Sequence, residues 1–306
     1  MQFDTNKVTI IGCGKVGMTA AFSLLHTGLI NELVLFGRSK QKLLGEQLDL
    51  EHALGFLPHA DIQASDDWSD VAKSDVIVYT AGESQKPGQN RLDLVETNVA
   101  ILEKMLPNML RHAPNAVILV VANPVDILTY KAYQMAGWPK GRIFGSGTAL
   151  DTARFRFHLS EFLHLNPNSI HASILGEHGD TSFPVLSSAT VGGQPLTSMD
   201  RFSKEQALKA YEQARKAAYK IIDCKGATYY GIGLVIAHIV SKILRNAKSV
   251  LSLSIPLHQY HGHSGIALSV PCVLGREGVQ ETLQAKLDWR EKQQLQHSVE
   301  TLKKYL

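Results

Sequence analysis

Short apolar runs alternate with amphipathic, helix-like segments through the first half of the chain. Four runs have the length and composition of buried strands, at residues 8–11, 33–36, 76–79 and 117–121. The periodic segments between them predict helices that end near residue 25 and that cover residues 43–54 and about 92–112. Strands that alternate with helices are typical of a parallel sheet with helices on both faces. The pattern predicts an α/β fold with a doubly wound parallel sheet.

The pattern changes after Gly145. A helix over residues 149–165 precedes a turn at 166–168 and a group of mixed strands. Two long helices follow, at about 203–223 and 228–247, then an antiparallel hairpin over 250–276 and an amphipathic helix over 287–305. We therefore expect two domains with a cleft between them: residues 1–145 with the parallel sheet, and residues 146–306 with an α+β arrangement.

Composition narrows the function classes. The chain has 306 residues, of which 44% are hydrophobic and 19% charged, and no basic block lies behind its net charge of +3. A nucleic-acid partner is therefore not expected. We expect neither a signal peptide nor a membrane span, because no apolar run approaches the length needed to cross a bilayer.

Cysteine and histidine usage indicates a reducing cytoplasm and no metal centre. Cys13, Cys224 and Cys272 lie far apart and form no CxxC pair, unlike the cysteines of a zinc site or a disulfide-bonded scaffold. Three histidines crowd the tip of the expected hairpin: His258, His261 and His263. No carboxylate or cysteine stands near them at ligand spacing, so we interpret this segment as a solvated loop and expect no metal.

A glycine-rich turn follows the first expected strand and opens the first expected helix. It reads Gly12-Cys13-Gly14-Lys15-Val16-Gly17. In that context Gly-x-Gly-x-x-Gly is the Rossmann-type dinucleotide fingerprint, whose glycines permit a tight turn and a close approach of the backbone to a pyrophosphate. The helix N-terminus adds unpaired N–H groups and the positive end of its dipole. We expect Gly12, Gly14, Val16 and Gly17 to bind a dinucleotide cofactor.

The end of the second expected strand departs from the usual fingerprint. An acidic residue commonly lies there and binds the ribose 2′-hydroxyl, whereas this chain has Phe36-Gly37-Arg38-Ser39. Gly37 cannot repel a 2′-phosphate, and the guanidinium of Arg38 could pair with one. The segment therefore suggests that NADP is accepted as well as NAD. In the alternative interpretation Arg38 faces solvent and NAD binds adequately through its other contacts.

The segment Gly176-Glu177-His178-Gly179-Asp180 follows an apolar run and is the strongest catalytic candidate. A histidine held between glycines at a strand end suits a proton donor that works near neutral pH; the alternative is a histidine in a surface turn. Asp151 and Arg154 are three apart in an expected helix and so share a face. If that face lines the cleft, Asp151 can accept a hydrogen bond from His178, and Arg154 can bind a carboxylate with two parallel hydrogen bonds.

These motifs together resemble the lactate/malate dehydrogenase family. The resemblance rests on the glycine fingerprint, Asn123-Pro124, Asp151-x-x-Arg154, the His178 segment and the run Gly82-Glu83-Ser84-Gln85-Lys86-Pro87-Gly88-Gln89-Asn90-Arg91. It spans nearly the whole chain and is greatest for bacterial L-lactate dehydrogenases, notably in residues 85–88 and 226–231. The resemblance implies a cytoplasmic, homo-oligomeric oxidoreductase, a dimer or a tetramer, that acts on a 2-keto or 2-hydroxy acid.

The resemblance also implies roles for further residues. Arg91 would close over a bound keto acid and polarise its carbonyl. Asn123 would contact substrate and cofactor, and Thr228 and Ile232 would line the substrate and nicotinamide pocket. His178 would donate the proton and Arg154 would bind the substrate carboxylate.

Gln85 selects the substrate in this interpretation. The resemblance implies that malate enzymes carry an arginine at this position, which pairs with the second carboxylate of oxaloacetate. A neutral glutamine cannot compensate that charge once water is excluded, and burying an unpaired carboxylate costs several kcal/mol. The sequence therefore favours lactate over malate. A malate or broader 2-hydroxy-acid dehydrogenase stays as one alternative, and a dinucleotide-binding sensor without catalysis as another.

Arg156 and His171 are candidates for an effector site. Arg156 lies two residues after Arg154, so the two side chains point roughly 200° apart on a helix. Arg156 and His171 resemble the pair through which effector-controlled bacterial lactate dehydrogenases bind fructose 1,6-bisphosphate at a subunit interface. An ordinary surface arginine and a strand histidine are the alternative.

Overall fold

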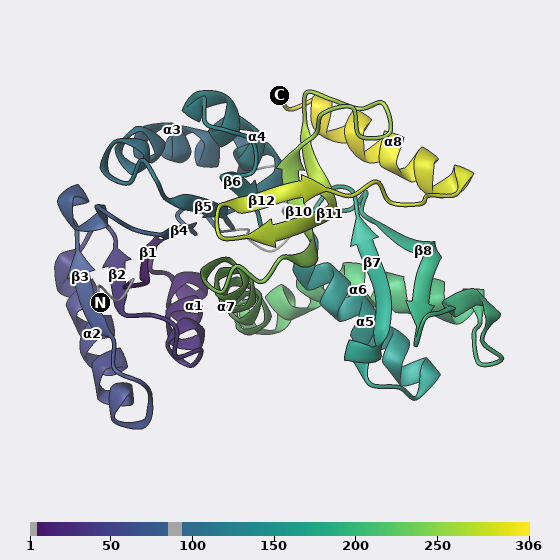
Figure 1. The fold of residues 1–306 in the computed structure, drawn as a ribbon, viewed down its shortest axis with the longest axis horizontal. Helices are drawn as coiled ribbons and strands as arrows, with labels where there is room; N and C mark the ends of the chain where they lie inside the picture. Colours follow the sequence, from purple (N-terminus) through teal and green to yellow (C-terminus); the bar gives the residue numbers. More distant parts are fainter. Residues whose placement is uncertain (1–4, 85–93) are drawn as a thin grey trace.

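The computed structural model describes residues 5–84 and 94–306, so the predictions for Gln85 and Arg91 lie outside the described residues. Six parallel strands form the first part of the sheet in the order β3-β2-β1-β4-β5-β6 (Figure 1). Their bounds are β1 (Lys7–Ile11), β2 (Glu32–Phe36), β3 (Asp61–Ser65), β4 (Val76–Tyr79), β5 (Val117–Val120) and β6 (Ile143–Gly145). This is the doubly wound Rossmann order, and the predicted fold class is confirmed. The sequence pattern did not identify β3 or β6.

Helices cover both faces of this sheet because neighbouring side chains of each strand point to opposite faces. Ile10 belongs to the core beneath α1 (Lys15–Leu25), α2 (Lys40–Ala53) and α7 (Tyr230–Leu244). Ile11 belongs to the other core, beneath α3 (Val95–His112) and α4 (Val125–Ala136). The sequence pattern did not predict helix α4. It predicted a helix over residues 228–247, whereas α7 begins at Tyr230 and ends at Leu244.

The hairpin predicted over 250–276 is present and continues the parallel sheet. It consists of β10 (Ser249–Pro256) and β11 (Ala267–Gly275), followed by β12 (Gly278–Thr282). Ser254 of β10 pairs with Gly145 of β6 in antiparallel fashion, which extends the sheet to the order β12-β11-β10-β6-β5-β4-β1-β2-β3. The sheet is therefore not interrupted at residue 145, where the sequence pattern changes.

A smaller antiparallel sheet lies to one side of the large one (Figure 1). It contains β7 (Ile170–Leu175), β8 (Phe183–Val191) and β9 (Gln194–Pro195). Helices α5 (Ala149–Leu163) and α6 (Lys204–Lys225) share a third core with it. Helix α8 (Trp289–Lys303) begins with a capping box made by Asp288 and Glu291, as expected for an N-terminal signal of this type.

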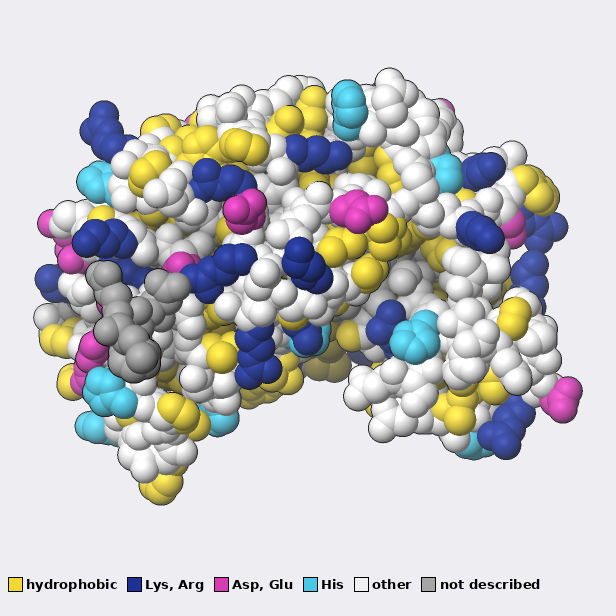
Figure 2. Space-filling model, in the orientation of Figure 1, with side chains coloured by type: hydrophobic (Ala, Val, Ile, Leu, Met, Phe, Trp, Pro, Cys, Tyr) yellow, Lys and Arg dark blue, Asp and Glu magenta, His cyan; other side chains and the backbone are white. Residues whose placement is uncertain are grey.

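The surface carries charges of both signs. On the face drawn in Figure 2, Lys and Arg side chains are dispersed among acidic, apolar and neutral ones. None of the helices in the described ranges is both long and apolar enough to span a bilayer.

Candidate active site

The loop after β7 is attached directly to the large sheet. The N–H of Gly176 donates to the Ser269 carbonyl over 3.0 Å, and the N–H of Ser269 donates back over 2.9 Å. Gly176 has φ +90°, and a Cβ there would lie 2.6 Å from the Ser298 hydroxyl. Only glycine fits such a position without strain. The loop that carries His178 therefore leaves β7 at a fixed angle.

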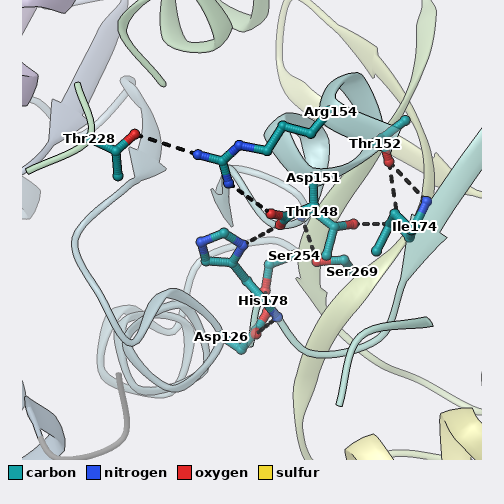
Figure 3. Close-up of polar contacts among 10 residues, drawn as sticks. All are labelled: Asp126, Thr148, Asp151, Thr152, Arg154, Ile174, His178, Thr228, Ser254 and Ser269. Carbon is teal, nitrogen blue, oxygen red and sulfur yellow. Dashed lines mark hydrogen bonds and ion pairs between the residues drawn. The ribbon is translucent and has the colours of Figure 1, made fainter. Parts of the chain in front are cut away.

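His178 and Asp151 form a direct side-chain contact (Figure 3). Nδ1 of His178 lies 2.6 Å from Oδ2 of Asp151, and each side chain is 14% exposed. A carboxylate only accepts hydrogen bonds, so Nδ1 carries the proton and Nε2 is the nitrogen that can exchange a proton with a ligand. The pair predicted from the sequence is thus brought together.

Arg154 lies one turn further along α5. Its Nη1 is 3.3 Å from Oδ1 of Asp151, and its Nη2 donates to the Thr228 hydroxyl over 3.5 Å. Figure 3 shows Thr228, Arg154, Asp151 and His178 in one continuous chain of contacts. Four of the residues predicted from the sequence therefore share one site, drawn from α5, the loop after β7 and the segment before α7.

Two threonines fix the start of α5 against β7. The Thr148 hydroxyl donates to the Ile174 carbonyl over 2.5 Å, and the Thr148 N–H donates to the Ser269 hydroxyl over 3.0 Å. One turn later, the Thr152 hydroxyl accepts the Ile174 N–H over 3.0 Å. These bonds place Asp151, in the first turn of α5, opposite the His178 loop.

Asp126 is a second carboxylate at the site, and the sequence analysis missed it. Its Oδ2 accepts the main-chain N–H of His178 over 2.7 Å, and its Oδ1 accepts the Ser254 hydroxyl over 2.6 Å. The residue is 3% exposed. Burial, with smaller contributions from Glu177 and Asp151, raises the pKa of the Asp126 carboxyl from 3.8 to about 7, and the two hydrogen bonds oppose that rise. The sequence offered one signal for this role: Asp126 is an acidic residue within the apolar run that follows Asn123-Pro124.

The other members of the His178 segment stiffen it. Glu177 is buried, and its Oε2 accepts the N–H of Thr181 over 3.2 Å and also the Thr181 hydroxyl. A Cβ on Gly179 would lie 2.3 Å from Oε1 of Glu177, so a larger residue there would displace the buried Glu177 side chain. Asp180 accepts from the Tyr219 hydroxyl over 3.1 Å, which ties the end of the segment to α6.

The glycine fingerprint leaves space for a ligand. A Cβ on Gly12 would lie 2.5 Å from the Ala81 nitrogen, and one on Gly17 would lie 2.3 Å from the Gly12 carbonyl oxygen. A Cβ on Gly14 would meet nothing within 4 Å in the protein. Two glycines are thus needed for chain packing, and the open space over Gly14 at the start of α1 fits a bound phosphate group. Val16 and Ile232 are partly buried, and both pack against the core that contains Ile10.

Asn123 lies just beyond β5, at the edge where the parallel strands end. Its carbonyl oxygen accepts the Asn98 amide over 2.6 Å, and Asn98 Oδ1 accepts the Glu83 N–H over 2.7 Å. Within the described residues, the buried Oδ1 of Asn123 has no hydrogen-bond partner. A buried acceptor of this kind calls for a donor, and a bound cofactor or substrate would supply one. Asn98, which holds this corner, was also missed.

Gly37 and Arg38 follow directly after β2. Gly37 donates its N–H to the Ser65 carbonyl over 3.1 Å, and Arg38 is exposed beside it. A Cβ on Gly37 would lie 3.3 Å from Leu43 Cδ1, so a side chain can be accommodated with a small adjustment.

Arg156 and His171 lie near each other, on α5 and β7. Nε of Arg156 donates to the Ala172 carbonyl over 2.8 Å, and burial lowers the pKa of its guanidinium. His171, which precedes Ala172 on β7, is exposed.

In the hairpin, His261 Nε2 lies 3.0 Å from the Ala285 carbonyl oxygen. Among the described residues, no three His, Cys, Asp or Glu side chains are grouped as metal ligands.

Comparison with known proteins gives the family. Residues 6–145 match the profile described as lactate/malate dehydrogenase, NAD binding domain, and residues 148–306 match lactate/malate dehydrogenase, alpha/beta C-terminal domain. The chain belongs to the lactate/malate dehydrogenase family, an oxidoreductase family with a nicotinamide dinucleotide cofactor, as the motif resemblance predicted.

Bacterial L-lactate dehydrogenases are among its relatives. The chain is 44% identical to the L-lactate dehydrogenase of Moorella thermoacetica, over 98% of this chain and 96% of the relative. It is 41% identical to L-lactate dehydrogenase 2 of Bacillus cereus, over 99% and 98% of the two chains. The crystal structure of a minor L-lactate dehydrogenase from Enterococcus mundtii superimposes with a TM-score of 0.94 at 37% identity, covering 98% of this chain and 97% of the other.

The buried Asp126 carboxylate gives a stability prediction. Between about pH 4 and about pH 7 the folded protein holds this proton while the unfolded chain has released it, so the stability of the wild type falls as the pH rises through that window. The Asp126→Asn variant has no titrating group at this position, so its stability does not fall for this reason. We predict that its free energy of unfolding, relative to the wild type, increases with pH across the window by up to roughly 4 kcal/mol. Urea denaturation at several pH values measures the difference; a difference independent of pH would contradict the prediction.

Proposed function

We propose that this protein is an L-lactate dehydrogenase that interconverts pyruvate and L-lactate. The observation that carries the proposal is the 2.6 Å contact between His178 and Asp151, with Arg154 on the same carboxylate. The direct test is a steady-state assay of pyruvate against oxaloacetate, each with NADH and NADPH. Turnover of pyruvate with high preference supports the proposal; preference for oxaloacetate would favour the malate dehydrogenase alternative.

The residues at the site suit proton transfer to a 2-keto acid. The turn at Gly12, Gly14 and Gly17 would hold a nicotinamide dinucleotide, which would supply a hydride in one direction of the reaction and accept one in the other. His178 donates a proton from Nε2 to the carbonyl oxygen, which becomes the hydroxyl of lactate, while Asp151 holds the ring through Nδ1 and stabilises the imidazolium. The guanidinium of Arg154 binds the substrate carboxylate and so orients the carbonyl.

Sequence alone supports the roles of Gln85 and Arg91. Arg91 would polarise the carbonyl as negative charge develops on its oxygen. Gln85 supplies no countercharge for a second substrate carboxylate, which supports pyruvate as the substrate. Asn123 and Thr228 complete the proposed substrate contacts.

A non-catalytic sensor is a weaker proposal. A sensor has no use for a histidine whose ring nitrogen is held at 2.6 Å by a carboxylate, beside an arginine on the same helix. Turnover by the purified protein excludes a sensor.

We also propose a cytoplasmic homo-oligomer. Apolar side chains spaced four residues apart are exposed on two helices, Leu44 and Leu48 on α2 (41% and 47%) and Tyr230 and Leu234 on α7 (66% and 65%). Residues four apart share a helix face, and exposed apolar stripes of this kind favour contact with another protein surface. The same stripes serve either a dimer or a tetramer.

The first functional prediction concerns Asp151. Asp151→Asn removes the charge that holds the His178 imidazolium, so pyruvate reduction should fall by about 10²- to 10⁴-fold, while NADH affinity is unchanged. Glu161→Gln is a matched control, because Glu161 holds His158 on the same helix over 3.0 Å but in a far more exposed pair; its turnover should equal that of the wild type. An Asp151→Asn enzyme with wild-type turnover would exclude His178 as the proton donor.

A second prediction concerns specificity. Gln85→Arg supplies the countercharge for a second carboxylate and should raise the ratio of kcat/KM for oxaloacetate over pyruvate by roughly tenfold or more, which corresponds to about 1.4 kcal/mol. Gln89→Arg adds the same charge elsewhere in the segment and should leave the ratio near that of the wild type. Equal ratios in the two variants would show that Gln85 is not the selector.

A third prediction concerns the cofactor. We propose that Gly37 and Arg38 let the enzyme accept NADPH as well as NADH, and that Gly37→Asp shifts the preference toward NADH by repelling the 2′-phosphate. Gly45→Asp is the matched control, because it adds the same charge on α2 where a side chain meets nothing within 4 Å. A wild-type preference for NADH of roughly a hundredfold, about 2.7 kcal/mol, would contradict the proposal.

A fourth prediction concerns regulation. Arg156 and His171 could form, across a two-fold axis, a basic pocket for fructose 1,6-bisphosphate that favours the active assembly. Added bisphosphate should then lower the pyruvate concentration at half saturation when the enzyme is dilute enough to dissociate. His171→Ala should abolish this response, and His59→Ala, at a remote and exposed histidine, should keep it. Identical wild-type curves with and without the bisphosphate would refute the effector site.

A further inference from the structure

Asp126 has features that chain packing alone does not explain. It is 3% exposed, yet its two hydrogen-bond donors are neutral, the main-chain N–H of His178 and the hydroxyl of Ser254. Burying a carboxylate without a cation costs free energy, and an amide of the same shape would serve packing at lower cost. A polar group kept at such a cost next to a reactive residue suggests a role in the reaction.

The two hydrogen bonds connect His178 with the centre of the large sheet. Ser254 is fully buried on β10 and pairs with Gly145 of β6. Asp126 lies in the first turn of α4, so it links the start of this helix, the sheet and the His178 loop. Two carboxylates therefore hold His178: Asp151 binds Nδ1 of its ring, and Asp126 binds its main-chain N–H (Figure 3).

We propose that Asp126 is a positioning residue for proton transfer at His178: it anchors the main chain of His178 to Ser254, and in its ionised form its negative charge favours the imidazolium that donates the proton. This inference rests on the proposed function. When His178 gives its proton to the carbonyl oxygen, the charge that Asp126 and Asp151 stabilise disappears. It returns when lactate is oxidised and His178 takes up the hydroxyl proton. Asp126 itself touches no reacting atom.

The surrounding charges fit this assignment. The groups that face Asp126 are Glu177 and His178 on the loop after β7 and Asp151 on α5, whereas β10 presents the neutral Ser254. Asp151 is also paired with Arg154. The imidazolium belongs to the residue whose main chain Asp126 binds, and burial lets a charge act on its neighbours more strongly than it would in water. The positive end of the α4 dipole further favours the carboxylate.

The pH profile of pyruvate reduction tests the proposal. Above about pH 7 the Asp126 carboxyl of the wild type is ionised, and Asp126→Asn removes this negative neighbour of the imidazolium. The alkaline fall in kcat/KM should therefore begin at lower pH than in the wild type, with an approximately tenfold or greater loss of kcat at alkaline pH and an unchanged KM for NADH. Asp75→Asn is the matched control. Asp75 also accepts a main-chain N–H, from Lys7 over 2.8 Å, but pairs with Arg276 away from the site; its variant should lose stability and keep the wild-type profile.

Two further measurements keep the proposal testable if Asp126→Asn folds poorly or if pyruvate is not the substrate. Ser254→Ala keeps the Asp126 carboxyl and loosens the anchor, and it also removes a hydrogen bond that lowers the Asp126 pKa. The kcat should therefore fall severalfold, with a smaller shift of the alkaline limb than in Asp126→Asn. NMR of the ring nitrogens of His178, recorded without substrate, should show that it loses its proton at lower pH in Asp126→Asn. A folded Asp126→Asn variant with the wild-type profile and the wild-type His178 titration would overturn the proposal. A wild type inactive with pyruvate would refute the proposed function and leave the NMR test intact.

Discussion

The pairing of Ser254 with Gly145 determines how the molecule is assembled, because it adds an antiparallel hairpin to the last parallel strand. Through this pairing, β10 brings Ser254 to Asp126, and β11 brings Ser269 to both Gly176 and Thr148. Each of those contacts fixes a segment that carries a proposed catalytic residue. A change of register by one residue would turn both serines to the opposite face of the sheet.

The site combines strong constraint with a cost in stability. Gly176 is required because of its φ of +90° and the nearby Ser298 hydroxyl, and a Cβ on Gly179 would displace the Glu177 side chain. Asp126 is buried with only neutral hydrogen-bond donors. By contrast, two features leave room for a ligand. No described residue fills the space over Gly14, and none donates a hydrogen bond to Oδ1 of Asn123. Proteins commonly tolerate such local costs where a ligand or a reaction must be accommodated.

Local signals in the sequence were enough for four of the six parallel strands, β1, β2, β4 and β5, and for the central pair of the site. The strand, glycine turn and helix at Gly12 are contiguous, and Asp151 and Arg154 share a helix face, so periodicity alone places them. Asp126 was missed because its role depends on the register of β10, and Ser254 is 128 residues away in the chain. Similarly, β6 has only three residues and gave no pattern, so the continuity of the sheet beyond it could not be predicted.

The proposed reaction depends on His178 as the proton donor, and one measurement tests this role most directly. Single-turnover reduction of pyruvate by the enzyme–NADH complex can be compared between the wild type and His178→Ala, with NADH affinity followed by fluorescence on the same samples. The account predicts a loss of about 10²- to 10⁴-fold in the rate with unchanged NADH affinity. A His178→Ala variant that reduces pyruvate at the wild-type rate would contradict it.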